Sequence, residues 1–131
     1  MNRAITFAVF GTVLCALLLT AGCGKSDKEQ YSSPSFMIES TLGVIDGLKK
    51  VLPTKDIYQL SLTTGQVSGA LADLPTYATS PAGKAKAKKA IEMFEKEVSP
   101  TIVSLQYDPA AIGKKLDEIR AIVVEVGKEV K

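Results

Sequence analysis

Residues 108–130 read DPAAIGKKLDEIRAIVVEVGKEV, and this stretch has the most regular apolar spacing in the chain. Its large aliphatic residues recur at intervals of four, three, four, three and four, at Ile112, Leu116, Ile119, Val123, Val126 and Val130. That spacing places all of them on one face of an α-helix. Asp108 is a preferred helix cap and Pro109 suits a first helical turn. The stretch therefore predicts an amphipathic helix with a defined start.

A similar pattern of cap, proline and apolar spacing appears earlier in the chain, over about residues 34–52. Ser33 is a candidate cap, Pro34 follows it in the first turn, and Pro53 closes the segment. One apolar face is formed by residues spaced three and four apart, namely Ile38, Leu42, Ile45, Leu48 and Leu52. These features predict a first helix that begins at Pro34.

A second helix is expected over about residues 55–73, with Thr54 as its cap. Its seam has a 3-4-3-4-3 rhythm that resembles a coiled coil, through Ile57, Leu60, Thr64, Val67, Leu71 and Leu74. Residues 73–79 contain Pro75 and several polar side chains, so we expect a loop there.

The third helix opens with Ser80 and Pro81, as the first opens with Ser33 and Pro34. Pro100 either kinks this helix or ends it near Val98. The apolar spacing continues beyond the proline, which favours a kink. The sequence leaves both possibilities open.

Four helices with short connections predict an all-α fold, an antiparallel up-down-up-down four-helix bundle over residues 34–131. Each apolar stripe is too narrow to form a stable helix alone, so the four stripes must share one core. In length and helix order the region resembles the cytochrome b562 and cytochrome c′ bundles. Those families bind haem through histidine, and the chain has none. The resemblance therefore implies the layout and no cofactor.

The first 22 residues have the layout of an export signal. Arg3 is followed by an apolar run, and small residues lead to Cys23 in the sequence Thr20-Ala21-Gly22-Cys23. This ending resembles the lipobox of bacterial lipoproteins, although Thr20 stands where an aliphatic residue is commoner. The resemblance implies cleavage before Cys23, a diacylglycerol thioether on its sulfur and usually acylation of the new amino terminus. An ordinary cleaved signal and a transmembrane anchor are the alternatives, but the apolar run is short for a membrane span.

After cleavage, residues 23–33 are expected to form a lipidated, flexible tether, since they are polar and prone to turns. Gly24 stands where an aspartate would resemble the inner-membrane retention signal of proteobacteria. We therefore expect a cell-envelope protein, held at the periplasmic face of the outer membrane if the source has two membranes.

Composition excludes several kinds of chemistry. The chain has no histidine, and its only other cysteine, Cys15, is lost with the signal. No thiol nucleophile, disulfide or histidine-based metal site remains, so we expect no cofactor and no enzymatic activity. The formal net charge is +2, and Arg3 accounts for one of these charges. Such near neutrality argues against nucleic acid as a partner.

Two pairs of glycines stand four residues apart inside the first two predicted helices, at Gly43, Gly47, Gly65 and Gly69. A glycine within a helix costs about 1 kcal/mol relative to alanine, so some compensation is expected. We expect close packing between these two helices, which small residues permit. The alternative is an interaction face for a protein partner or a homodimer.

A basic run opens the third predicted helix, at Lys84, Lys86, Lys88 and Lys89. Such a run usually forms a solvated helix face. Contact with anionic phospholipid is the alternative, since a lipid on Cys23 would hold the domain near a membrane.

Together these observations favour a lipid-anchored, periplasm-facing helical bundle with a non-enzymatic binding or envelope-structural role. A carrier that holds a small or haem-like molecule within the bundle is the alternative.

Overall fold

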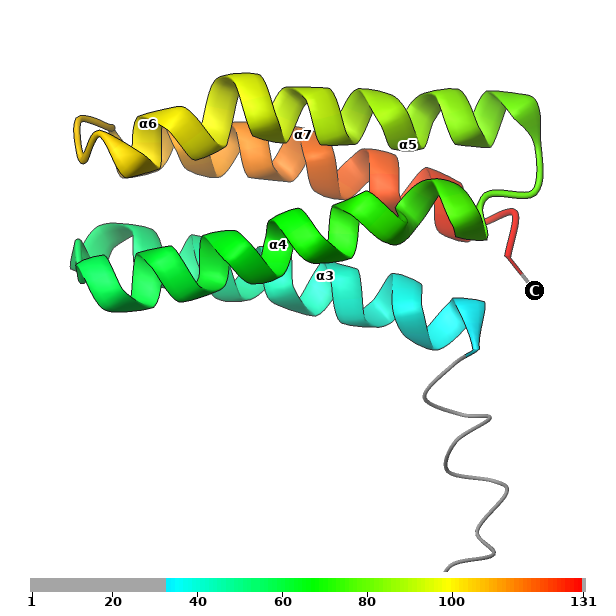
Figure 1. The fold of residues 1–131 in the computed structure, drawn as a ribbon, viewed down its shortest axis with the longest axis horizontal. Helices are drawn as coiled ribbons and strands as arrows, with labels where there is room; N and C mark the ends of the chain where they lie inside the picture. The colour runs from blue at the N-terminus through cyan, green and yellow to red at the C-terminus, as the bar shows by residue number, and fades with distance from the viewer. Residues whose placement is uncertain (1–32, 131) are drawn as a thin grey trace, which may run out of the picture. The chain divides into compact units, whose positions relative to one another are not determined.

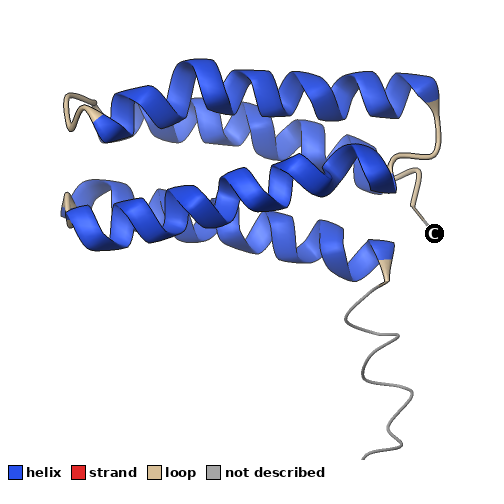
Figure 2. Cartoon of the chain, viewed as in Figure 1, coloured by secondary structure: helices blue, strands red, loops and turns tan. Residues whose placement is uncertain are grey.

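A computed structural model of the chain describes residues 33–130. The predicted signal peptide, Cys23 and the tether up to residue 32 lie outside the described residues. The described part is all-α, as the apolar spacing predicts, and contains no strand (Figure 2). Its long helices are α3 (Pro34–Val51), α4 (Ile57–Tyr77), α5 (Pro81–Met93) and α7 (Pro109–Gly127). Three shorter elements connect or extend them: the 3-10 turn η1 (Leu52–Thr54), the π-helical turn η2 (Phe94–Val98) and α6 (Ser99–Val103).

Three of the four predicted helix starts are confirmed. The Ser33 side chain accepts a hydrogen bond from the backbone N–H of Phe36, and Ser80 accepts one from Gly83. Asp108 accepts bonds from the backbone of the first turn of α7. Each cap is followed by a proline, whose missing N–H needs no partner at that position.

The predicted cap of the second helix is wrong. Lys55 adopts a left-handed backbone (φ 52°) after the η1 turn, so the new helix begins at Ile57. Asp56 is its cap and accepts bonds from the N–H groups of Tyr58 and Gln59 at 3.0 and 3.1 Å. The hydroxyl of Thr54 instead donates backwards, to the carbonyl of Val51.

The loop predicted over residues 73–79 is also wrong for most of its length, because α4 runs through Pro75 to Tyr77. Leu74 and Ala78, on either side of the proline, are both buried. Burying a leucine side chain contributes about 1.5–3 kcal/mol. An internal proline costs roughly 3 kcal/mol, so burial of Leu74 together with Ala78 offsets most of this cost and keeps the last turn helical.

The third helix does not end near Val98. Its path continues from α5 through η2 into α6, and the N–H of Ser99 donates to the carbonyl of Phe94, five residues back. A π-turn inserts an extra residue into the helix, which opens the backbone just before the ring of Pro100. Burial of Phe94, Val98 and Ile102 holds the segment in place.

One core lies between the four long helices. α3 packs against α4 and α7, and α5 packs against the same two helices (Figure 1). The α7 seam is buried as predicted, and its last member, Val130, packs against the core while partly exposed. The buried members are Ile112, Leu116, Ile119, Val123 and Val126. The α4 seam is buried from Leu60 onward, but its expected first member, Ile57, is 65% exposed. None of the described helices is both long and apolar enough to span a bilayer.

The two ends of the helical region differ. At one end, here called the Ser33 end, Gly127 lies against Ile38 and Glu129 is bonded to Ser80. At the other, the Leu105 end, the buried Tyr107 hydroxyl donates to the carbonyl of Leu52 at 2.8 Å. Figure 1 shows the first turn of α3 and the last turn of α7 at one side, and the α6 to α7 connection at the opposite side.

Candidate functional site

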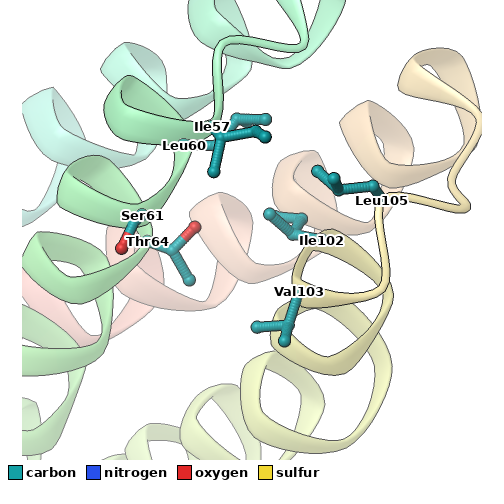
Figure 3. Close-up of a pocket in the computed structure, with 7 residues that line it drawn as sticks. All are labelled: Ile57, Leu60, Ser61, Thr64, Ile102, Val103 and Leu105. Carbon is teal, nitrogen blue, oxygen red and sulfur yellow. The ribbon is translucent and has the colours of Figure 1, made fainter.

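An apolar groove opens at the Leu105 end, between the start of α4 and the end of α6 (Figure 3). Its volume is about 260 Å³. The walls come from two segments: Ile57, Leu60, Ser61 and Thr64 on α4, and Ile102, Val103 and Leu105 on α6 and the turn after it. None of these seven side chains is ionisable.

The local sequence explains why the groove stays open. α4 packs mainly on α3 and α5 and touches α6 only lightly. Beyond Pro100, α6 lasts less than one turn, and Leu105 then takes a left-handed backbone (φ 57°) that turns the chain toward α7. The rims of the groove are therefore apolar and exposed to solvent: Val103 is 77% exposed and Leu105 is 42% exposed.

Thr64 is the one buried polar group in this groove that lacks a partner. The residue is 8% exposed, and its Oγ1 makes no hydrogen bond among the described residues. In Figure 3 its side chain extends from α4 toward Ile102. Thr41 and Thr63, also within helices, satisfy their hydroxyls by donating to the carbonyl four residues back, at 2.8 and 2.6 Å. Thr64 is therefore an exception among comparable threonines.

Sequence reasoning missed this site. The spacing of Thr64 places it in the apolar seam of the second helix, and the spacing of Ile57 places it in the core for the same reason. A hydroxyl within an otherwise aliphatic seam was the signal in the sequence. Its meaning depends on the distance between α4 and α6, which spacing does not give.

The expected close packing at the four glycines is wrong. A Cβ added at Gly43, Gly47, Gly65 or Gly69 meets nothing within 4 Å, so these positions face open space. The glycines that do permit close approach are two others. A Cβ at Gly127 would lie 2.8 Å from Ile38 Cγ2, and one at Gly83 would collide with the Glu129 carboxylate.

The four lysines of the basic run are exposed along the first turns of α5, which begin at the Ser33 end. Lys86 reaches α7, where its Nζ lies 3.7 Å from Glu125 Oε2. Lys84, Lys88 and Lys89 form no ion pair within residues 33–130. The run is thus exposed, with one member tied to α7, and this exposure is compatible both with a solvated face and with contact to anionic phospholipid.

Glu129, which follows α7 in the chain, contacts the N-terminal cap of α5. Its carboxylate accepts hydrogen bonds from the Ser80 hydroxyl at 2.7 Å and the Ser80 backbone N–H at 3.2 Å. The Ser80 hydroxyl bond, together with backbone donors and Lys86, lowers the pKa of Glu129 against the opposing effect of desolvation. A carboxylate here is favourable beside the positive N-terminal end of the α5 dipole. The neighbouring lysines are unfavourable there, because they add positive charge to the same end.

Cys23, the predicted lipidation site, lies outside the described residues. Within residues 33–130, no group of three or more acidic or cysteine side chains is arranged to hold a metal ion. No protein-family model, curated protein or solved structure matches this chain.

Proposed function

We propose that this chain is a lipid-anchored, periplasm-facing protein whose helical domain binds a ligand or partner without catalysing a reaction. The domain is an antiparallel up-down-up-down four-helix bundle. Support for this arrangement comes from the packing of α3 and α5 each against α4 and α7, and from the short connections between successive helices.

The anchor follows from the sequence of residues 1–23. A lipobox-like ending places a diacylglycerol group on Cys23, and two or three acyl chains give stable membrane attachment where one does not. Residues 23–33 then connect the lipid to Ser33. The protein is thereby held in the cell envelope. If the source has two membranes, Gly24 at the position of the retention aspartate favours the outer membrane.

One observation carries the binding role: the apolar groove lies at the Leu105 end, opposite the end at which the chain enters the bundle. The 18 residues of α3 rise about 1.5 Å each, so the helix alone separates the two ends by about 27 Å. A membrane at the Ser33 end thus leaves the groove open to the periplasm.

The non-enzymatic part of the proposal rests on side-chain inventory. The chain contains no histidine, and its Cys23 thiol is consumed by the lipid. The groove is lined by aliphatic and hydroxyl side chains, none of which has a pKa suited to proton transfer near neutrality.

Replacement of the acceptor cysteine tests the anchor. Cys23→Ser should abolish labelling by radioactive palmitate and release the protein from the membrane fraction, because the thioether cannot form. Cys15→Ser is the matched control and should leave both properties unchanged. Retention of the Cys23→Ser protein in the membrane would show that an uncleaved apolar segment holds it, and the lipid anchor would be wrong.

A further inference from the structure

The groove between α4 and α6 has features of a ligand site. We propose that it binds a small, neutral, mainly apolar molecule that carries one hydrogen-bonding group, which pairs with the Thr64 hydroxyl. This inference rests on the binding role proposed above and names the chemistry of what is bound.

The volume sets the size of the ligand. At about 260 Å³ the groove is larger than the roughly 150 Å³ apolar cavity known to hold benzene. It is smaller than the roughly 300–1,000 Å³ pockets that hold drug-sized molecules. One ring with a short substituent, or an alkyl chain of similar volume, matches this space.

The lining sets the charge of the ligand. Because none of the seven residues is ionisable, an ion would lose its hydration in the groove without gaining a counter-charge. The exposed rims formed by Ile57 and Val103 instead gain from contact with an apolar surface that removes them from water. The groove therefore complements a neutral molecule.

Thr64 sets the polar group. A buried hydroxyl without a partner is unfavourable, and a backward bond to the Leu60 carbonyl, the usual remedy in a helix, is not formed. A ligand that donates to or accepts from Oγ1 would remove this cost. A ligand without such a group would leave it in place.

Three photoreactive probes of one shape test the proposal on the full chain in its native membranes. All are 3-phenyl-3-(trifluoromethyl)diazirines: one bears a para-hydroxymethyl group, one has no substituent, and one bears a para-carboxylate. Mass spectrometry locates the adducts. We expect the hydroxymethyl probe to label the groove residues, chiefly on Ile57, Thr64 and Val103, and the carboxylate probe to label them least.

Thr64→Val keeps the side-chain volume and removes the hydroxyl. It should reduce groove labelling by the hydroxymethyl probe about two- to ten-fold, as expected for one hydrogen bond, and should not reduce labelling by the unsubstituted probe. Thr63→Val is the matched control, because its hydroxyl is bonded to Gln59 and lies outside the groove lining; it should change neither. Val103→Asp, at an exposed position, should suppress labelling by both neutral probes.

Equal labelling of wild type and Thr64→Val by the hydroxymethyl probe overturns the proposal, as do adducts spread outside the groove. Groove labelling that falls as the amount of protein in the membrane rises would show that a second copy covers the groove, and this too overturns it. The Cys23→Ser protein carries the same groove. Failure of the anchor therefore appears in fractionation alone and is distinguishable from failure of the groove.

Discussion

The glycines of α3 and α4 show at the scale of single residues what a pattern can and cannot reveal. Their spacing of four was visible in the sequence and predicted a close helix contact. The structure instead leaves Gly43, Gly65 and Gly69 exposed and facing open space. Spacing states only that residues share a face; whether a neighbour covers that face depends on how the helices are rotated.

Exposed helix glycines lower stability without a compensating contact, so their replacement has a definite expected sign. Gly65→Ala and Gly69→Ala should each raise the free energy of unfolding by about 0.5–1 kcal/mol, because alanine restricts the unfolded chain and fits open space. Thermal unfolding followed by circular dichroism measures this.

Gly127→Ala is the contrasting variant in the same experiment. Its new methyl group would lie 2.8 Å from Ile38 Cγ2, so we expect a lower melting temperature. If Gly65→Ala destabilised the protein as Gly127→Ala does, another surface would have to cover that face of α4, and the interaction-face interpretation would be favoured.

Among the helices, three of the four predicted caps are confirmed, whereas the cap at Thr54 and the loop at Pro75 are wrong. Ser33, Ser80 and Asp108 cap their helices as expected, because a cap needs only its own first turn. Pro75 lies inside a helix because Leu74 is buried, and Pro100 is accommodated because a π-turn precedes it. Neither outcome can be read from the proline alone, since both depend on side chains from other helices.

The contact of Glu129 with Ser80 joins the end of the chain to the start of α5, and it predicts a pH dependence. The pKa of Glu129 is lowered in the folded protein, chiefly by the Ser80 hydroxyl bond. The folded state therefore binds fewer protons than the unfolded state near this pKa. The resulting stability is present above the ordinary pKa of 4.5 and is lost as pH falls through the lowered value.

Glu129→Gln should thus destabilise the protein at pH 7 and converge with wild type at low pH. Urea unfolding at several pH values between about 3 and 7 measures the difference. The pKa of Glu125 is also lowered, first by its bond to Lys128. The stability of both proteins, wild type and Glu129→Gln, therefore keeps one acid-sensitive contribution. Glu92→Gln, which removes an exposed pair with Lys96 at 3.8 Å, should have a smaller effect. A constant difference across the pH range would contradict the linkage.

For the whole molecule, the sequence predicted the helices and their common core but not the difference between the two ends. The core follows from seams such as Leu116, Ile119 and Val123, which are all fully buried. The groove follows from a short α6 that diverges from α4, a property of two segments some forty residues apart. The apolar spacing within either segment alone does not predict the groove.

The proposed anchor and the position of the basic run together predict how the molecule stands on a membrane. Lys84, Lys88 and Lys89 lie near the Ser33 end, to which the proposed tether connects, whereas Lys55 lies at the Leu105 end. Each lysine near an anionic surface gains about 1 kcal/mol, an attraction that salt screens. In vesicles containing phosphatidylglycerol, the lipidated protein should therefore have Lys84 and Lys88 protected from a water-soluble acylating reagent.

Mass spectrometry of the acylated protein gives the reactivity of each lysine separately, so Lys55 serves as an internal reference. The protection of Lys84 and Lys88 should disappear in phosphatidylcholine vesicles and in about 1 M salt, where the Debye length shrinks to about 3 Å. Lys86 is a poor reporter, because Glu125 already holds it. If Lys84 and Lys55 reacted equally in both kinds of vesicle, the basic run would be a solvated face alone. If Lys55 were the protected residue, the groove would face the membrane, and a ligand would then reach it from the lipid.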